Sequence, residues 1–64
     1  MEMKRTDRKV RITDNYGKTY ERYIHEEKRF YQEYIKFNNQ WVSIEKLNGQ
    51  LRALSGYIIS VERI

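Results

Sequence analysis

The chain has 64 residues, which allows one domain at most, and a net charge of +4. Its hydrophobic content of 39% and aromatic content of 14% argue against disorder, and the lack of cysteine excludes disulfides and cysteine-based zinc sites. No apolar run approaches the length of a membrane span, and the charged N-terminus lacks the apolar stretch of a signal peptide, so we expect a cytoplasmic protein without membrane contact.

Most of the net charge lies at the N-terminus. The first eleven residues contain five cations and two acids, whereas the rest of the chain contains eight cations and seven acids. We therefore predict a flexible basic arm over residues 1–8, followed by a single small β domain over residues 9–64. Such an arm can lie along phosphates and release counterions. A solvated leader that aids solubility is the alternative.

Two strands are predicted in the first part of the β domain. Val10 to Asp14 alternates apolar and polar residues with β-branched side chains, the pattern of a half-buried strand. Asp14, Asn15 and Gly17 are turn residues. Lys18 to His25 then has the bulky side chains of a return strand, so the stretch predicts a hairpin.

The central stretch, residues 30–46, predicts a second hairpin around the two-residue turn Asn38-Asn39. A short helix within residues 25–37 is the competing interpretation, because Phe30, Tyr34 and Phe37 recur at helical spacing among Glu, Lys and Gln. We favour strands because aromatic and β-branched residues cluster from Phe30 onward.

The C-terminal third shows the clearest strand pattern. Val42 and Ile44 alternate with polar residues, and Asn48-Gly49 is the strongest hairpin signal in the chain. Residues 51–54 form the return strand, Ser55-Gly56 forms another turn, and residues 57–64 form the last strand. The whole pattern predicts a mainly β fold, either a small antiparallel sheet or an SH3-like barrel of five to six strands.

Residues 42–62, VSIEKLNGQLRALSGYIISVE, resemble the strand–turn–strand of Sm-like and other SH3-like small barrels. The resemblance implies a strand that bends at Gly56 and continues through Ile58 and Val61. The chain departs from the Sm pattern because it leaves no room beyond Ile64 for the later strands that carry RNA-binding loops in that family. The resemblance therefore implies a small barrel and assigns no RNA-binding residues.

The residues that could support catalysis do not form a recognisable site. His25 is the only histidine, and with Glu27 on the same face of a strand it would make an incomplete metal site. There is no cysteine nucleophile, and the three glycines are isolated, so no phosphate-cradling loop is present. We expect a non-enzymatic protein with no cofactor, no metal and no small-molecule substrate.

Binding is the function class that remains, and the position of the positive charge favours nucleic acid, either DNA or RNA, as the partner. The basic arm would supply phosphate contacts, cations on the sheet would extend that surface, and aromatic side chains would offer stacking faces for bases. The predicted nucleic-acid-binding residues are Lys4, Arg5, Arg8, Lys9, Arg11, Lys18, Arg22, Tyr34, Lys36, Trp41 and Arg52.

A protein partner is the alternative. Tyr, Trp and Arg dominate interface energetics, and the chain contains six tyrosines. A short chain rich in Ile, Lys, Asn and Tyr also suits a phage or another mobile element, whose small proteins modulate a host protein or assemble as accessory subunits. Exposed strand edges could also pair in a homo-oligomer. Trp41 is out of phase with Val42 and Ile44, so either the sheet curls around both the tryptophan and the aliphatic side chains, as in a barrel, or Trp41 lies on an interaction surface.

Overall fold

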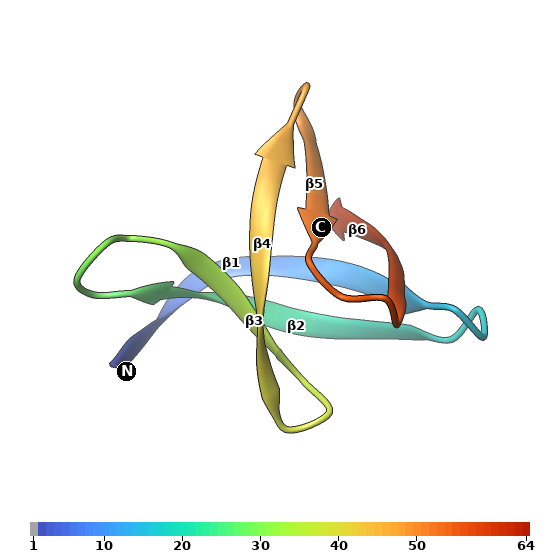
Figure 1. The fold of residues 1–64 in the computed structure, drawn as a ribbon, viewed down its shortest axis with the longest axis horizontal. Coiled ribbons are helices and arrows are strands. Elements are labelled where there is room, and N and C mark those ends of the chain that lie inside the picture. Colours follow the sequence, from blue (N-terminus) through green and yellow to red (C-terminus); the bar gives the residue numbers. More distant parts are fainter. Residues whose placement is uncertain (1) are drawn as a thin grey trace.

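The structure, a computed structural model, describes residues 2–64, which form six antiparallel strands. These are β1 (Met3–Asp14), β2 (Thr19–Glu27), β3 (Glu33–Phe37), β4 (Gln40–Leu47), β5 (Gln50–Ala53) and β6 (Ile58–Arg63). They form one sheet in the order β5-β4-β3-β2-β1-β6, in which β6 returns to pair with β1. The sheet curls until β5 and β6 lie beside each other, which makes a small, nearly closed barrel (Figure 1). The prediction of a mainly β fold is confirmed.

The inner side of the curled sheet carries the hydrophobic core. Its buried side chains alternate along most strands, because residues two apart on a strand point to the same side of the sheet. They are Val10, Ile12, Ile24, Ile35, Phe37, Val42, Ile44, Ile58 and Val61. Burying each such side chain stabilises the fold by roughly 1.5–3 kcal/mol relative to leaving it exposed. The apolar alternation in the sequences of β1 and β4 is therefore the pattern of this core.

Two tight turns form where the sequence predicted them. Asn38 and Asn39 connect β3 to β4 with φ angles of 49° and 63°, and Asn48 and Gly49 connect β4 to β5 with φ angles of 52° and 80°. Positive φ at both central residues is the type I′ geometry, whose twist matches that of paired strands. Asparagine and glycine adopt this region at the least cost, which explains their presence at these positions.

The β1–β2 hairpin is closed by the carboxylate of Asp14. Its Oδ1 atom accepts the N–H groups of Tyr16 and Lys18, both at 2.9 Å, and its Oδ2 atom accepts the Tyr20 hydroxyl at 3.1 Å. Burial alone would raise the pKa of Asp14, but these hydrogen bonds and the Lys18 charge outweigh burial and lower it. Burial, followed by the hydrogen bond to Asp14, raises the pKa of Tyr20. Gly17 completes the turn at φ 83°.

A seam separates β5 from β6, the two strands at the ends of the sheet order. Among the residues that the structure describes, no backbone ladder joins these strands. A groove follows the seam, lined by residues 49–52 on one side and 59–63 on the other. Gly56 lies in the connection of residues 54–57, between β5 and β6. The resemblance to Sm-like barrels implied a strand bent at this glycine, whereas here one strand ends before it and the next begins after it.

The short helix considered within residues 25–37 does not form. Residues 2–64 contain no helix, and so none that is long and apolar enough to cross a membrane. Helical spacing of aromatic residues did not mark a buried stripe, because Phe30 is 74% exposed while Phe37 is buried. Ile35 and Phe37 instead bury alternate side chains of β3, which is the strand pattern.

The N-terminal segment differs from the predicted arm. Residue 1 lies outside the described residues, and residues 3–8 belong to β1, in which Met3, Lys4 and Arg5 pair with the end of β2. The pairing of β1 with β2 is interrupted by a β-bulge between Arg5 and Lys9 and resumes at Lys9. Residues 3–8 thus belong to the same strand as residues 9–14.

Candidate nucleic-acid interface

Cations and aromatic rings gather on the outer side of four neighbouring strands, β1 to β4. The register joins them directly, since Arg5 faces His25, Lys9 faces Tyr23, His25 faces Tyr34, and Lys36 faces Trp41. Cross-strand partners lie on the same side of a sheet, and here that side is opposite the core. We call this set the cation–aromatic face: Arg5, Lys9, Tyr23, His25, Tyr34, Lys36 and Trp41.

The cations of this face lie over its rings. The guanidinium of Arg5 is 4.5 Å from the ring centroid of Tyr23, and Lys9 Nζ is 5.1 Å from the same centroid. Lys36 Nζ is 4.6 Å from the Trp41 ring centroid. At these distances the ring quadrupole attracts each cation, by about 0.5–1 kcal/mol at exposed sites. The charges are thereby held in defined positions while their outer sides remain open to solvent.

Trp41 also contacts β2. Its ring lies 4.9 Å from the His25 ring, centroid to centroid, at an interplanar angle of 61°, and His25 Nδ1 lies 3.2 Å from the Tyr23 carbonyl oxygen. Trp41 is half-buried, and it alternates with the buried Val42 on β4. The out-of-phase position noted in the sequence thus places Trp41 on the outer side of the barrel, packed against its neighbours.

A β-bulge in β1 brings Arg5 and Lys9 to one ring. Between these residues the register advances four positions on β1 but only two on β2. The Thr6 hydroxyl replaces the missing ladder contacts, because it donates to the Ile24 carbonyl at 2.7 Å and accepts the Arg8 N–H at 3.1 Å. Bulges re-aim side chains in this way at functional surfaces.

The charges of the face are only partly neutralised. Arg5 and Lys36 form no ion pair with any residue from 2 to 64. Lys9 shares Glu21 with Arg11, at 3.6 and 3.7 Å. Arg11 also faces Glu62 across the β1–β6 register, so Arg11 lies at an acidic margin of the face. The positive charge of the face is therefore unpaired at Arg5 and Lys36, and partly neutralised by Glu21 at Lys9.

Two of the predicted cations of the N-terminal segment point elsewhere. Arg8 lies on the other side of the bulge, where its guanidinium forms ion pairs with Glu26 at 3.2 Å and Glu33 at 2.6 Å. Lys4 faces Glu26 in the register and lines a shallow hollow beside it. The structure therefore separates these two residues from Arg5 and Lys9.

Three further predicted cations are dispersed over the barrel. Arg22 bridges β2 and β3 where their ladder ends, and its Nε donates to the Lys36 carbonyl at 3.2 Å. Lys18 lies at the tip of the β1–β2 hairpin, 5.4 Å from the Tyr20 ring centroid. Arg52 lies on β5 opposite Glu45. These residues do not join the cation–aromatic face.

Sequence reasoning did not assign His25 to the site, although it packs at the centre of the face. The only signal in the sequence was that His25 is two positions from Tyr23 and so lies on the same side of the strand. That signal assigns His25 to the site only once the strands that pair with β2 are known. No group of three or more His, Asp or Glu side chains suited to a metal ion occurs within residues 2–64. Comparisons of the chain with protein-family models, with curated proteins and with solved structures found no match.

Proposed function

We propose that this protein binds nucleic acid through the cation–aromatic face. The observation that carries the proposal is the cluster of Arg5, Lys9 and Lys36 over two rings on four adjacent strands. Cations at fixed positions can contact successive phosphates and release their counterions. The half-buried rings between them offer edges and partial faces to bases. The proposal keeps Arg5, Lys9, Tyr34, Lys36 and Trp41 from the sequence prediction and adds Tyr23 and His25.

The number of available cations sets the expected strength of binding. Three phosphate contacts predict a slope of about −2 for the logarithm of the binding constant against the logarithm of salt concentration, on a single strand. Such a slope means that the binding constant falls roughly fiftyfold between about 20 mM and about 150 mM salt. The proposal is therefore one of electrostatic binding without base-specific readout.

Charge-neutral substitutions test the proposal, with cations outside the face as matched controls. The Arg5→Gln/Lys36→Gln double variant should reduce the salt slope from about −2 to about −0.7, because two phosphate contacts are lost. The Lys46→Gln/Arg63→Gln variant removes the same charge from exposed positions outside the face and should keep the slope near −2. Binding is measured by anisotropy of a labelled oligonucleotide.

The single tryptophan provides a second readout within the face itself. Trp41 fluorescence should change when nucleic acid binds to the parent chain, since the ring belongs to the proposed surface. Equal losses in the two double variants would contradict the assignment of the face. An absence of binding at low salt would contradict the proposed function as a whole.

A protein partner is the second candidate function, and the seam between β5 and β6 favours it. Both strands present unpaired backbone edges there, and Ile59 on β6 is 66% exposed. Such edges can pair with an added strand, either from a host protein bound by a phage- or mobile-element-type protein or from a second copy of an accessory subunit. Sedimentation of the pure protein would reveal self-assembly as a mass above that of the monomer.

Two finer assignments accompany these proposals. The barrel is compatible with an Sm-like or SH3-like fold, and we propose that relationship at the level of architecture alone. We also propose a cytoplasmic location, which agrees with a non-enzymatic role on nucleic acid and with the sequence expectation. Localisation of a tagged chain in its host would test this assignment directly.

A further inference from the structure

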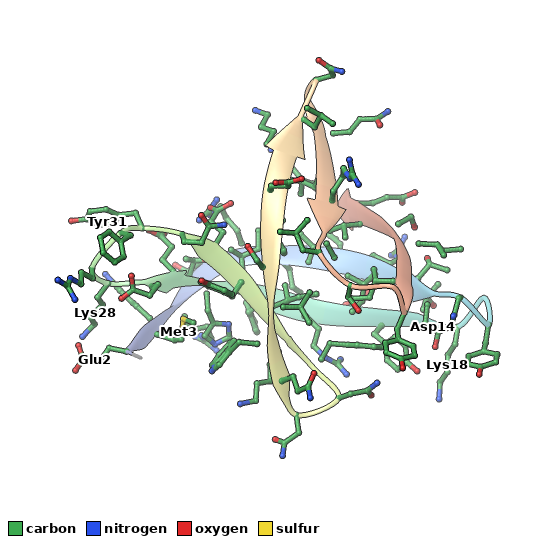
Figure 2. The ribbon with its side chains drawn as sticks, in the orientation of Figure 1. Glu2, Met3, Asp14, Lys18, Lys28 and Tyr31 are labelled. Atoms are coloured by element: carbon green, nitrogen blue, oxygen red, sulfur yellow. The ribbon has the colours of Figure 1, made fainter. Side chains whose placement is uncertain are left out.

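The turn between β2 and β3, residues 28–31, presents two aromatic rings that the barrel does not use. Phe30 and Tyr31 are each 74% exposed, whereas the rings of the cation–aromatic face are half-buried. The Arg29 guanidinium lies 5.1 Å from the Phe30 ring centroid. Figure 2 shows Tyr31 and Lys28 projecting at one end of the molecule. The turn therefore carries open ring faces together with positive charge.

A buried carboxylate holds this turn in one conformation. Glu27 is 8% exposed, and its Oε1 and Oε2 atoms accept the N–H groups of Arg29 at 2.9 Å and Phe30 at 2.8 Å. Its backbone carbonyl accepts the Tyr31 N–H at 2.8 Å. Because the turn is ordered before any ligand arrives, its rings lose little conformational freedom on binding.

Tyr31 is held in a conformation that bulky residues avoid. Its φ angle is 59°, in the left-handed region, which glycine adopts without cost and which a tyrosine adopts only under constraint. Strained backbone of this kind concentrates at binding sites. Tyr31 also lines a shallow hollow together with Lys4, Glu26 and Lys28. Lys28 is paired with Glu2, at 3.7 Å between Nζ and Oε2, at an exposed position where a phosphate can replace the carboxylate.

The turn continues directly into the cation–aromatic face. Tyr34 is three positions after Tyr31, so their Cα atoms are at most about 11 Å apart. We infer that Phe30 and Tyr31 stack on unpaired bases, and that the nucleic acid held on the face is single-stranded. In a duplex the faces of the bases are covered by their neighbours, whereas an unpaired base exposes its π-face. This inference rests on the proposed function and adds the strand preference.

The test compares a single strand and a duplex of the same sequence. The probe is a strand of about 12 nucleotides, within the site size of small single-strand binders, that carries 2-aminopurine as a reporter of stacking. DNA and RNA versions separate the two sources of unpaired bases. The Phe30→Ala/Tyr31→Gly variant removes both rings, and its glycine accepts the positive φ, so it should melt at or above the parent temperature.

The expected result is a loss confined to single strands. The double variant should bind the single strand at least roughly thirtyfold more weakly and lose the change in 2-aminopurine fluorescence, while duplex affinity stays unchanged. The matched control is Tyr16→Ala, which removes a ring that is 90% exposed at the tip of the β1–β2 hairpin. It should leave both affinities at the parent value.

Two kinds of failure are distinguishable. If the parent chain binds single strands and the Phe30→Ala/Tyr31→Gly variant binds them equally well, the inference about the turn is wrong and the proposed face stands. A parent chain that prefers duplex would likewise overturn the inference and leave the face in place. If the parent chain binds neither form at low salt, the proposed function fails, and the inference fails with it.

Discussion

Replacing Thr6 with valine tests whether one hydroxyl organises the bulge in β1. Valine has nearly the same shape as threonine and an equal or higher preference for strands, so the substitution removes little except the oxygen. That oxygen forms two hydrogen bonds, to the Ile24 carbonyl at 2.7 Å and from the Arg8 N–H at 3.1 Å. Both groups belong to positions where the regular ladder is interrupted.

The expected cost follows from these two bonds. Each intramolecular hydrogen bond contributes about 0.5–1.5 kcal/mol net, so losing both should destabilise the fold by about 1–3 kcal/mol. A domain of this size has a total stability of roughly 3–10 kcal/mol, so the loss is a large fraction of it. The melting temperature should fall by roughly 10 °C, since 1 kcal/mol corresponds to about 4–8 °C in small domains.

The matched control is Thr13→Val, on the same strand. Thr13 is half-buried like Thr6, and its hydroxyl forms no hydrogen bond with any described residue. Urea and thermal denaturation, followed by circular dichroism and Trp41 fluorescence, would give the two differences in unfolding free energy. Thr6→Val should also reduce the magnitude of the salt slope for nucleic-acid binding, because Arg5 and Lys9 lose their common position over Tyr23. Equal stability of the two variants would refute a structural role for the Thr6 hydroxyl.

Further predictions concern the hairpin carboxylate and the core. Because the pKa of Asp14 is lowered in the folded state, its ionised carboxylate stabilises the fold in full above the unfolded pKa near 4, and this stabilisation is lost as the pH falls through the folded pKa. The melting temperature of the parent should therefore drop more steeply with acid than that of Asp14→Asn. Because the pKa of Tyr20 is raised in the folded state, its protonated hydroxyl stabilises the fold in full below the unfolded pKa near 10, and this stabilisation is lost as the pH rises through the folded pKa. The melting temperature of Tyr20→Phe should therefore fall less steeply with rising alkaline pH than that of the parent. Ile35→Ala should cost about 2–5 kcal/mol in urea denaturation, against less than about 0.5 kcal/mol for the exposed Ile59→Ala, and similar costs would contradict the assigned core.

Local sequence signals predicted the parts of the fold that depend on neighbouring residues. Asn38-Asn39 and Asn48-Gly49 form turns because asparagine and glycine adopt positive φ, a property independent of the rest of the chain. The alternation in β4 predicted its buried face for the same reason, since the strand period is two. Such signals need no knowledge of which strands become partners.

The first half of β1 and the binding face depended on partners that the sequence does not state. Residues 3–9 lack apolar alternation, so no local signal distinguished a strand from a basic arm. The pairing of Arg5 with His25, and the approach of Trp41 to His25, join residues that are 20 and 16 positions apart in the chain. Only the register of β1 to β4 brings them to one side of the sheet.

The bulge also explains why two cations of the N-terminal segment converge on the outer side of the sheet. In a regular strand Arg5, Asp7 and Lys9 would share a side, and the acid would stand between the two cations. Here the residues between Arg5 and Lys9 leave the regular ladder, and Asp7 and Arg8 border a hollow that Ile24 also lines, on the core side of β2. Arg8 pairs there with carboxylates, while Arg5 and Lys9 converge on Tyr23. The positive character of the face therefore comes from backbone geometry, and the net charge of the segment alone does not predict it.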